Sequence, residues 1–350
     1  MGGDFTSIGG ITANYVARYS FATNTWSSLG TGSNNGTGAS VRAIAVDGNN
    51  VYVGGTFTTA GSLSSASYVA RFNLLSNTWS ALASTNGEGV NNFVNAISVL
   101  NGVVYVGGTF IRANNSGNIG TTIIANHIAR FNTANNTWLT LGRNDVFSGV
   151  NGAVSALAVF NGEIYLGGSF TTAASASITS ITANRVVRYA PTTNGFSAVG
   201  VGSGNGVDNS VFAIAVSGND LFFGGNFTVA NVNGTTVAAN RIVRFSGGAW
   251  SSVGTGSANG VDGTVFGITV SGSALYVGGN FTNAGGSVAN RLAFYNYRTN
   301  SWNKVGSSSG NGLDGTVRAL VAVGSDVWVG GDFANANVSG TLVPSAFIGR

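Results

Sequence analysis

Short apolar runs alternate with turn-forming residues along the whole chain. One run is almost entirely apolar and rich in β-branched residues, and its copies are Val41–Val46, Val94–Val99, Val154–Val159, Val211–Val216, Val265–Val270 and Val317–Val321. Each is followed by two to four residues rich in Gly, Asn and Asp, which are typical of a tight hairpin, and then by a second run that ends in Gly-Gly. Because no apolar spacing of about 3.6 residues persists for about a dozen residues, the pattern predicts an all-β chain.

The tetrad Gly-Gly-x-Phe divides the chain into seven repeats. Its copies end at Phe5, Phe57, Phe110, Phe170, Phe227, Phe281 and Phe333, 52 to 60 residues apart. A full repeat contains four segments, which we call a, b, c and d; between Val41 and Leu82 they read VRAIAV, NVYVGGTF, YVARF and NTWSALG. Segment a is apolar throughout, as in a strand covered on both faces, and is expected to be the innermost strand.

Seven repeats of four strands match the repeat length and blade number of a β-propeller. The sequence therefore predicts an all-β, seven-bladed propeller of four-stranded antiparallel blades, with incomplete first and last repeats and a single domain over residues 1–350. The repeats are anchored at Gly2, Gly54, Gly107, Gly167, Gly224, Gly278 and Gly330. Counting segments gives six a, seven b, seven c and six d. We expect the remaining strands to come from a longer polypeptide, or alternatively from a neighbouring copy, because an unpaired strand edge favours pairing.

The repeated residues have structural explanations. Paired glycines allow the backbone to leave the sheet through angles closed to other residues, and they let a neighbouring blade approach. The tetrad Phe and an aromatic residue of segment d are expected to fill the wedge between blades. That second residue is Trp26, Trp79, Trp138, Phe196, Trp250 or Trp302. Six arginines at one position of segment c are expected to stack on Trp and bond loop carbonyls; they are Arg18, Arg71, Arg130, Arg188, Arg244 and Arg350.

These motifs resemble a known family. Segment b, as in IYLGG and VYVGG, followed by V-A-R-F-N-x-x-x-N-T-W, is similar to the kelch repeat of galactose-oxidase-like propellers. The likeness covers the whole chain and is closer still to secreted bacterial propellers with V-G-G-x-F-x-x-A-G repeats. The resemblance implies a propeller fold and indicates little about a ligand. Galactose oxidase needs a Cys-modified Tyr for its copper chemistry, and since this chain contains no Cys, neither that activity nor a cofactor is expected.

Composition narrows the function classes. With 43% hydrophobic and 7% charged residues the chain is not of the disordered class, and no run approaches the roughly 18 apolar residues of a membrane-spanning helix. The net charge of +4 comes largely from the arginines of segment c, and with one Lys and no basic cluster a nucleic-acid partner is not expected. Few Lys and Glu residues beside many small polar ones favour an extracellular or cell-surface location.

Groups suited to catalysis are scarce. His127 stands at the start of a segment c where other repeats carry Tyr or Arg, so we interpret it as a variable strand residue. Acidic residues recur in the d-to-a loops as Asp208, Asp262 and Asp314. A ring of these carboxylates would hold a cation, but an Asx turn, in which the side chain bonds the backbone two residues on, is the favoured interpretation. No catalytic residue is predicted, and the three aspartates are only weak metal candidates.

The length variation between repeats indicates a binding face. It is concentrated in the b-to-c loops, of which Thr109–Ala125 and Ser169–Ala183 are the longest. Antiparallel strands place the b-to-c and d-to-a loops at the same end of each blade, where loops vary at little cost to the scaffold. The second residue of segment a, at the mouth of the predicted channel, is of mixed type. The candidate binding residues are therefore Arg42, Asn95, Ser155, Phe212, Phe266 and Arg318 in segment a and Arg112, Asn114 and Asn115 in the first long loop.

We expect a non-catalytic extracellular scaffold that presents the b-to-c and d-to-a loops for protein contacts or for assembly into a surface layer or fibre. Membrane insertion is not expected. An alternative is a carbohydrate-binding propeller in which exposed aromatic residues such as Phe147 or Tyr297 stack on sugars. A further alternative is a hydrolase or lyase with a site at the channel mouth.

Overall fold

β-Strands make up almost all of the regular structure. The computed structural model describes residues 1–84, 87–115, 122–142, 148–174, 180–200, 205–232, 234–306, 311–338, 341–345 and 347–350. In these ranges the helical turns are two short 3-10 segments, η1 (Gly32–Asn34) and η2 (Gly256–Ala258), and there is no α-helix. The all-β prediction is confirmed. The described ranges also contain no helix that is long and apolar enough to cross a bilayer.

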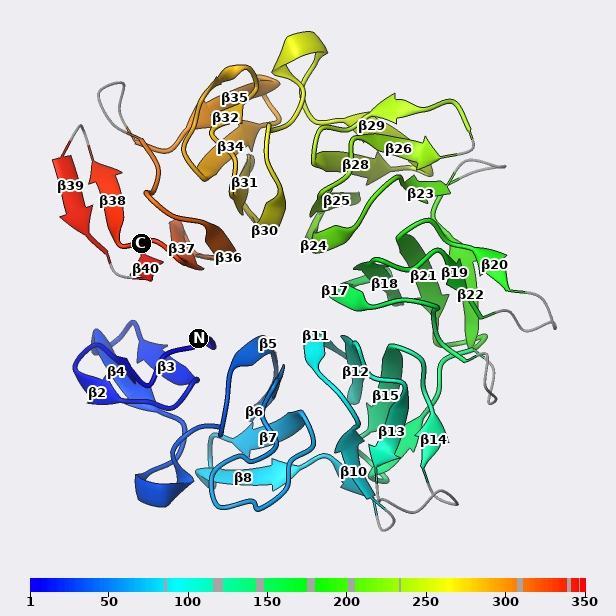
Figure 1. Ribbon diagram of the computed structural model, residues 1–350, viewed down its shortest axis with the longest axis vertical. Coiled ribbons are helices and arrows are strands. Elements are labelled where there is room, and N and C mark those ends of the chain that lie inside the picture. The colour runs from blue at the N-terminus through cyan, green and yellow to red at the C-terminus, as the bar shows by residue number, and fades with distance from the viewer. Residues whose placement is uncertain are drawn as a thin grey trace. The chain divides into compact units, whose positions relative to one another are not determined.

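Five sheets each contain four strands that follow one another in the order a, b, c, d (Figure 1). The first two are β5 (Val41–Asp47), β6 (Asn50–Gly55), β7 (Val69–Asn73) and β8 (Thr78–Ala81), and β11 (Val94–Leu100), β12 (Val103–Gly108), β15 (Ile128–Asn132) and β16 (Thr137–Leu139). The third is β17 (Val154–Phe160), β18 (Glu163–Gly168), β21 (Val186–Ala190) and β22 (Gly195–Ala198). The last two are β24 (Val211–Ser217), β25 (Asp220–Gly225), β28 (Ile242–Ser246) and β29 (Ala249–Ser252), and β30 (Val265–Ser271), β31 (Ala274–Gly279), β34 (Leu292–Asn296) and β35 (Ser301–Lys304).

The first and last repeats are incomplete, as predicted. The first has β3 (Ala17–Ser20) paired with β4 (Thr25–Ser28), and Gly2 forms an isolated bridge to Val16. The last has three strands, β36 (Val317–Val323), β37 (Asp326–Gly331) and β40 (Ile348–Gly349). The observed architecture of successive four-stranded blades is that of a β-propeller.

Shorter strands lie outside the blades. They are β1 (Ser7–Ile8), β2 (Ile11–Thr12), β9 (Ala83–Ser84), β10 (Gly87–Val90), β13 (Arg112–Asn115), β14 (Ile123–Ile124), β19 (Thr172–Ala173), β20 (Ile181–Thr182), β23 (Asn205–Val207), β26 (Val229–Val232), β27 (Val237–Ala238), β32 (Asn283–Ala284), β33 (Ser287–Val288), β38 (Asn335–Val338) and β39 (Thr341–Pro344). Most of them belong to the b-to-c loops.

Backbone contacts divide the chain into two compact units. The first contains Met1–Ile164, Phe170–Thr182 and Tyr189–Ser197, and the second contains Tyr165–Ser169, Ala183–Arg188 and Ala198–Arg350. Residues of the sheet that contains β17 are therefore shared between the two units. The prediction of a single domain over the whole chain stays a prediction, and each unit is described by itself below.

Burial differs from the expectation for segment a. Strand b is the strand covered on both faces, since all residues of β6, β12, β18 and β25 after the first are buried. Strand a is buried mainly at its first and third residues, as in β5, where Arg42 and the last two residues are exposed. Strand a lies at one edge of each four-stranded sheet, so it has one hydrogen-bonded neighbour where strand b has two.

The paired glycines are required by close approach. A Cβ atom on Gly107 would lie 2.5 Å from Cγ1 of Val154 in the next blade, and one on Gly108 would lie 2.0 Å from the carbonyl oxygen of Phe93. The first glycine of most other pairs makes the same contact with a Val of the next strand a, for example Gly54 with Val94. None of the seven pairs has a positive φ, so the prediction of a special backbone angle at these glycines is wrong.

Aromatic residues fill the space between consecutive blades. The tetrad phenylalanines from Phe57 to Phe333 are at most 1% exposed. The indole Nε1 of Trp138 donates to the carbonyl oxygen of Leu82 in the preceding blade at 2.8 Å, and that of Trp302 donates to Val253 at 3.0 Å. These residues pack the structure, as the repeat pattern predicted.

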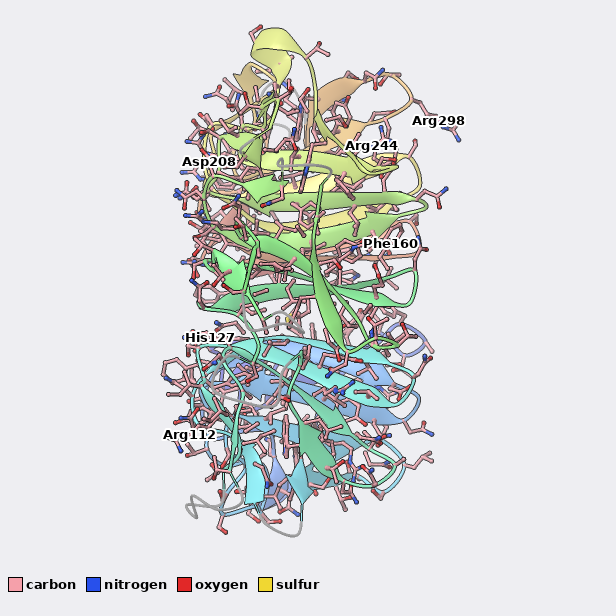
Figure 2. The ribbon with its side chains drawn as sticks, turned by 90° about the vertical axis from the view of Figure 1, so that its right-hand side faces the viewer. Arg112, His127, Phe160, Asp208, Arg244 and Arg298 are labelled. Atoms are coloured by element: carbon pink, nitrogen blue, oxygen red, sulfur yellow. The ribbon has the colours of Figure 1, made fainter. Side chains whose placement is uncertain are left out.

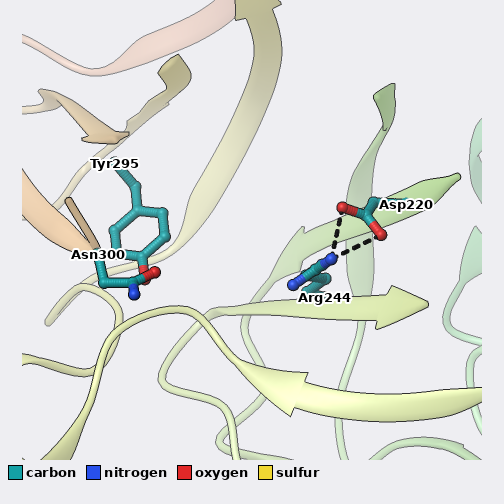
Figure 3. Close-up of polar contacts among 4 residues, drawn as sticks. All are labelled: Asp220, Arg244, Tyr295 and Asn300. Atoms are coloured by element: carbon teal, nitrogen blue, oxygen red, sulfur yellow. Dashed lines mark hydrogen bonds and ion pairs between the residues drawn. The ribbon is translucent and has the colours of Figure 1, made fainter. Parts of the chain in front are cut away.

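The arginines of strand c bond side chains of neighbouring strands. Arg244 forms an ion pair with Asp220 on strand b at 2.8 Å (Figure 3). Arg71 donates to Ser80 on strand d at 3.0 Å. Side chains rather than the predicted loop carbonyls are the partners of these two residues. Figure 3 also shows Tyr295 beside Asn300, to which it donates at 3.2 Å across the turn between strands c and d.

Candidate functional site

The b-to-c and d-to-a loops lie together at one end of the blades, and we call this end the loop face. Figure 2 shows Arg112 and His127 at this edge of the first unit and Phe160, from an a-to-b hairpin, nearer the opposite edge. In the second unit Asp208 lies at the loop face and Arg298 at the opposite edge. The arrangement within each unit agrees with the prediction from antiparallel strand order.

The loop face carries a second layer of β-structure. Each d-to-a loop pairs with the following b-to-c loop, as β10 does with β13 and β23 does with β26. In other repeats the same pairing is reduced to a single bridge: Thr37–Ala60, Val150–Ala173, Val261–Ala284 and Leu313–Ala336. The sequence pattern did not predict this layer, because its strands are too short for an apolar alternation to be visible.

A buried pair of polar residues joins successive loops. Asn184 donates through Nδ2 to Oδ1 of Asn205 at 2.9 Å, and both side chains are 7% exposed. Gly206 follows with a φ of +56°, and a Cβ there would lie 2.0 Å from the carbonyl oxygen of Asn184. Equivalent pairs are Asn14–Asn35, Asn126–Ser148, Asn240–Asn259 and Asn290–Asn311. Sequence reasoning missed these residues, although the recurrence of Ala-Asn about 20 residues before Asn-Gly was a visible signal.

The three recurring aspartates each bond the next b-to-c loop. Oδ1 of Asp262 accepts the backbone N–H groups of Thr282 and Asn283 at 2.8 and 2.9 Å, and Oδ2 accepts from their side chains at 2.8 and 2.7 Å. Asp208 and Asp314 accept the equivalent backbone groups. The predicted partner, the backbone two residues on, was wrong: the bonded amides lie 20 and 21 residues downstream.

These contacts make the aspartates poor ligands for a cation. Burial alone would raise the pKa of Asp262, but the hydrogen bonds from Asn283 and Thr282 outweigh it and lower that pKa to about 2. The N–H donors occupy the oxygens that a metal would need. Among the described residues, no group of three or more His, Cys, Asp or Glu side chains is placed to hold a metal ion.

A β-bulge sets the direction of the predicted binding residues in strand a. The register between strands a and b shifts across the second residue of strand a in five repeats. The bulged residues are Arg42, Asn95, Phe212, Phe266 and Arg318. A bulge leaves one residue unpaired and turns its side chain away from the regular alternation, and bulges are frequent beside binding sites.

Within each unit these bulged residues contact one another. Nη1 of Arg42 donates to Oδ1 of Asn95 at 3.0 Å, and its guanidinium carbon lies 5.1 Å from the ring centre of Phe93. In the second unit the rings of Phe212 and Phe266 are 5.5 Å apart, and Arg318 lies 5.1 Å from the second ring. The sixth predicted residue, Ser155, is half-buried in the first unit.

A second repeated position has a left-handed backbone. The residue before the main run of strand c has a φ between +62° and +69° in all seven repeats: Tyr15, Tyr68, His127, Arg185, Arg241, Arg291 and Phe347. Its N–H bonds the tetrad phenylalanine and its carbonyl accepts from the second tetrad glycine, as His127 does with Phe110 and Gly108. His127 is thus one of seven residues that occupy the same turn position, and burial lowers its pKa.

The remaining candidate residues differ in how exposed they are. Arg112 is exposed on the loop face, whereas Asn114 is 8% exposed and so offers little surface to a partner. The backbone of Asn115 pairs with Glu88. Tyr297 is half-buried and stacks on Phe222 at 5.8 Å, so it does not present the exposed ring that the carbohydrate alternative requires. Phe147 and residues 116–121 and 175–179 of the long loops lie outside the described residues.

Comparisons with known proteins agree with the observed blades. The family model "Rax2 C-terminal beta propeller domain" matches residues 258–344. Among solved structures, the computationally designed protein Ika8 has a TM-score of 0.51 and 12% identity, over 91% of this chain and 76% of that chain. YjhT gives 0.46 and 14%, over 86% and 93%, and a chain in the mitotic checkpoint complex gives 0.49 and 14%, over 84% and 72%. No curated protein matches the sequence. The chain has a β-propeller fold, and its kelch-like and bacterial particulars stay predictions.

Proposed function

We propose that the protein is a non-catalytic interaction scaffold whose loop face binds a protein partner, which is either another protein or a second copy of the chain. The observation that carries this proposal is a backbone that repeats while its side chains change. The bulged position of strand a holds Arg, Asn or Phe on the same local geometry. The left-handed position likewise holds Tyr, His, Arg or Phe. These side chains are exposed or half-buried, and a constant scaffold with variable side chains at its surface is the usual design of a recognition surface.

A non-catalytic role is supported by the use of the acidic residues. Asp208, Asp262 and Asp314 hold neighbouring loops through backbone N–H groups, and their oxygens are occupied. The pKa values of all three are lowered, which does not suit a general acid at neutral pH. We further propose an extracellular or cell-surface location, for which the composition with few Lys and Glu residues is the support.

Site-specific photo-cross-linking tests the scaffold. A photoreactive residue replaces Arg112 on the loop face, and a matched one replaces Leu75, which is 79% exposed in the turn between strands c and d at the opposite end. In the native cells, cross-linking at position 112 is expected to give one discrete protein adduct, and position 75 is expected to give none.

Two outcomes would contradict the proposal. Equal cross-linking from both positions would show that the loop face has no special role. Binding to defined sugars on a glycan array, lost on substitution of Phe212 or Phe266 and without any protein adduct, would instead support the carbohydrate-binding alternative.

A further inference from the structure

Three arginines on the loop face of the second unit have no counter-ion among the residues that the structure describes. Arg185, Arg241 and Arg291 occupy the left-handed position in consecutive repeats, with φ values of +64°, +63° and +62°. No ion pair or side-chain hydrogen bond connects them to another described residue, and the Nε atom of Arg241 is buried without a partner. By contrast, Arg244, Arg318 and Arg350 pair with aspartates at 2.6 to 2.8 Å.

Among the described residues, the aspartates of the d-to-a loops form no ion pair with these arginines. The oxygens of Asp208, Asp262 and Asp314 accept backbone and side-chain donors of the b-to-c loops. A half-buried guanidinium that lacks an acceptor keeps its donors available, and its planar fork matches a carboxylate. The three side chains are half-buried, so a bound carboxylate would be only partly screened by water.

Repeat equivalence places a pair of aromatic residues close to Arg241 and Arg291. In the first unit, Tyr68 at the left-handed position contacts the ring of Phe93 at 5.8 Å, and Arg42 at the bulged position lies over that same ring. In the second unit the equivalent positions are Arg241, Thr264 and Phe212, and one repeat further they are Arg291, Thr316 and Phe266. Arg241 and Arg291 are therefore each separated from an aromatic side chain by a single hydroxyl-bearing residue, whereas the positions equivalent to these two beside Arg185 hold serines.

We propose that Arg185, Arg241 and Arg291 form a basic row that binds an acidic, extended peptide segment of the protein partner. The arginines donate hydrogen bonds to its carboxylates, and the Phe212–Phe266 pair packs against one of its apolar side chains. The proposal rests on the proposed function, because it names the chemistry of the partner. A peptide is favoured over an acidic polysaccharide because the aromatic pair beside the basic row suits a ligand that carries both acidic and apolar side chains.

Fluorescence anisotropy with synthetic peptides tests this assignment. The probe is a fluorescein-labelled peptide of alternating Glu and Leu residues, and its matched control has Gln in place of Glu. The variants are R185Q, R241Q and R291Q, singly and combined, because Gln keeps part of the stem while removing the charge. Arg298, which is exposed at the opposite edge, supplies the control variant R298Q (Figure 2).

We expect peptide binding to depend on the positive charge of the arginines on the loop face and not on Arg298 at the opposite edge. Each single substitution is expected to lower the affinity for the acidic peptide about tenfold, as for the loss of one charge-assisted hydrogen bond. The combined variant should show no binding, R298Q should bind as the unsubstituted protein does, and binding should weaken as salt rises. Unchanged melting temperatures of the variants would confirm that folding is not the cause.

Three outcomes would overturn the assignment. They are failure of the unsubstituted protein to bind the acidic peptide, equal loss of affinity in R298Q and R241Q, and tighter binding of a sulfated polysaccharide than of the peptide. Cross-linking from position 112 is independent of these results, so failure of the basic row is distinguishable from failure of the scaffold proposal.

Discussion

The tetrad glycines show how far the packing between blades can be predicted from single residues. The sequence correctly predicts the close approach of blades at Gly-Gly, because only the absence of a side chain explains two glycines at every repeat. It does not distinguish close approach from a special φ, since both require Gly. The structure separates them: Gly107 and Gly108 have ordinary backbone angles and crowded surroundings, whereas Gly102 in the hairpin has a φ of +73°.

Substitution of Gly108 by Ala is expected to destabilise the protein by about 2 kcal/mol or more, as overpacking does. The new Cβ would lie 2.0 Å from the carbonyl oxygen of Phe93, a backbone atom that the N–H of Thr109 holds in place at 3.0 Å. Urea unfolding measures the change in the free energy of unfolding. Gly195 is the control, because its Cβ would meet only the end of the Thr193 side chain at 3.3 Å. Equal destabilisation by G195A and G108A would contradict the steric explanation.

Asp262 is expected to make the stability of the protein depend on pH in the acid range. Because its pKa in the folded protein is about 2, below the ordinary value of 3.8, the unfolded chain takes up a proton first. Its contribution is therefore complete above about pH 4 and is lost as the pH falls toward 2. D262N is expected to cost about 1 kcal/mol at neutral pH and to flatten this dependence, as measured by urea unfolding across the range. An unchanged pH slope in D262N would contradict the assignment.

Strands were predicted more completely than the loops between them. The segment from Val41 to Val46 was correct to within one residue of β5, because alternating turns and apolar runs mark each strand. The error in burial between strands a and b has a physical cause: an apolar composition does not show whether a strand lies at the edge of its sheet or between two neighbours. The loop layer and the pairing of Asn184 with Asn205 depend on contacts between loops about 20 residues apart.

The buried Asn184–Asn205 pair is expected to contribute to the stability of the loop face. N184A leaves the Asn205 side chain without this partner, at a cost of about 1–3 kcal/mol. A double-mutant cycle with N205A measures the coupling between the two, which is expected to be near 1 kcal/mol. The control is N303A, since Asn303 is exposed and bonds only Ser301 within its own strand. Additive effects of N184A and N205A would exclude a direct contribution of the pair.

At the scale of the whole molecule, stability is divided among contacts between consecutive repeats. Within each unit, consecutive blades pack on one another through the tetrad glycines, the buried phenylalanines and the indole rings, as expected for a repeat protein. Fold class was therefore predictable from the repeat pattern, since seven copies of one sequence unit specify one kind of blade. The two compact units follow from contacts that no repeat pattern reveals.

Replacement by Phe is expected to change the stability of the protein differently at two equivalent Trp residues. W138F removes a buried hydrogen bond of 2.8 Å to the carbonyl of Leu82, and we expect a loss of about 1–2 kcal/mol with faster amide exchange in β15, β16 and β8. W250F is expected to be neutral or slightly stabilising, because the Nε1 atom of Trp250 is buried and has no partner in the described part of the chain. Exchange that accelerates equally in β30 after W138F would contradict nearest-neighbour coupling.

The left-handed position before strand c affects how the binding specificity of such a protein can evolve. Its backbone angle is held by two hydrogen bonds that involve only main-chain atoms, so the conformational strain is the same whether the residue is Tyr, His, Arg or Phe. A mutation there alters the chemistry of the loop face while leaving the main-chain bonds of the blade in place. Each repeat thus offers one site at which a new specificity can arise by a single substitution, independently of its neighbours.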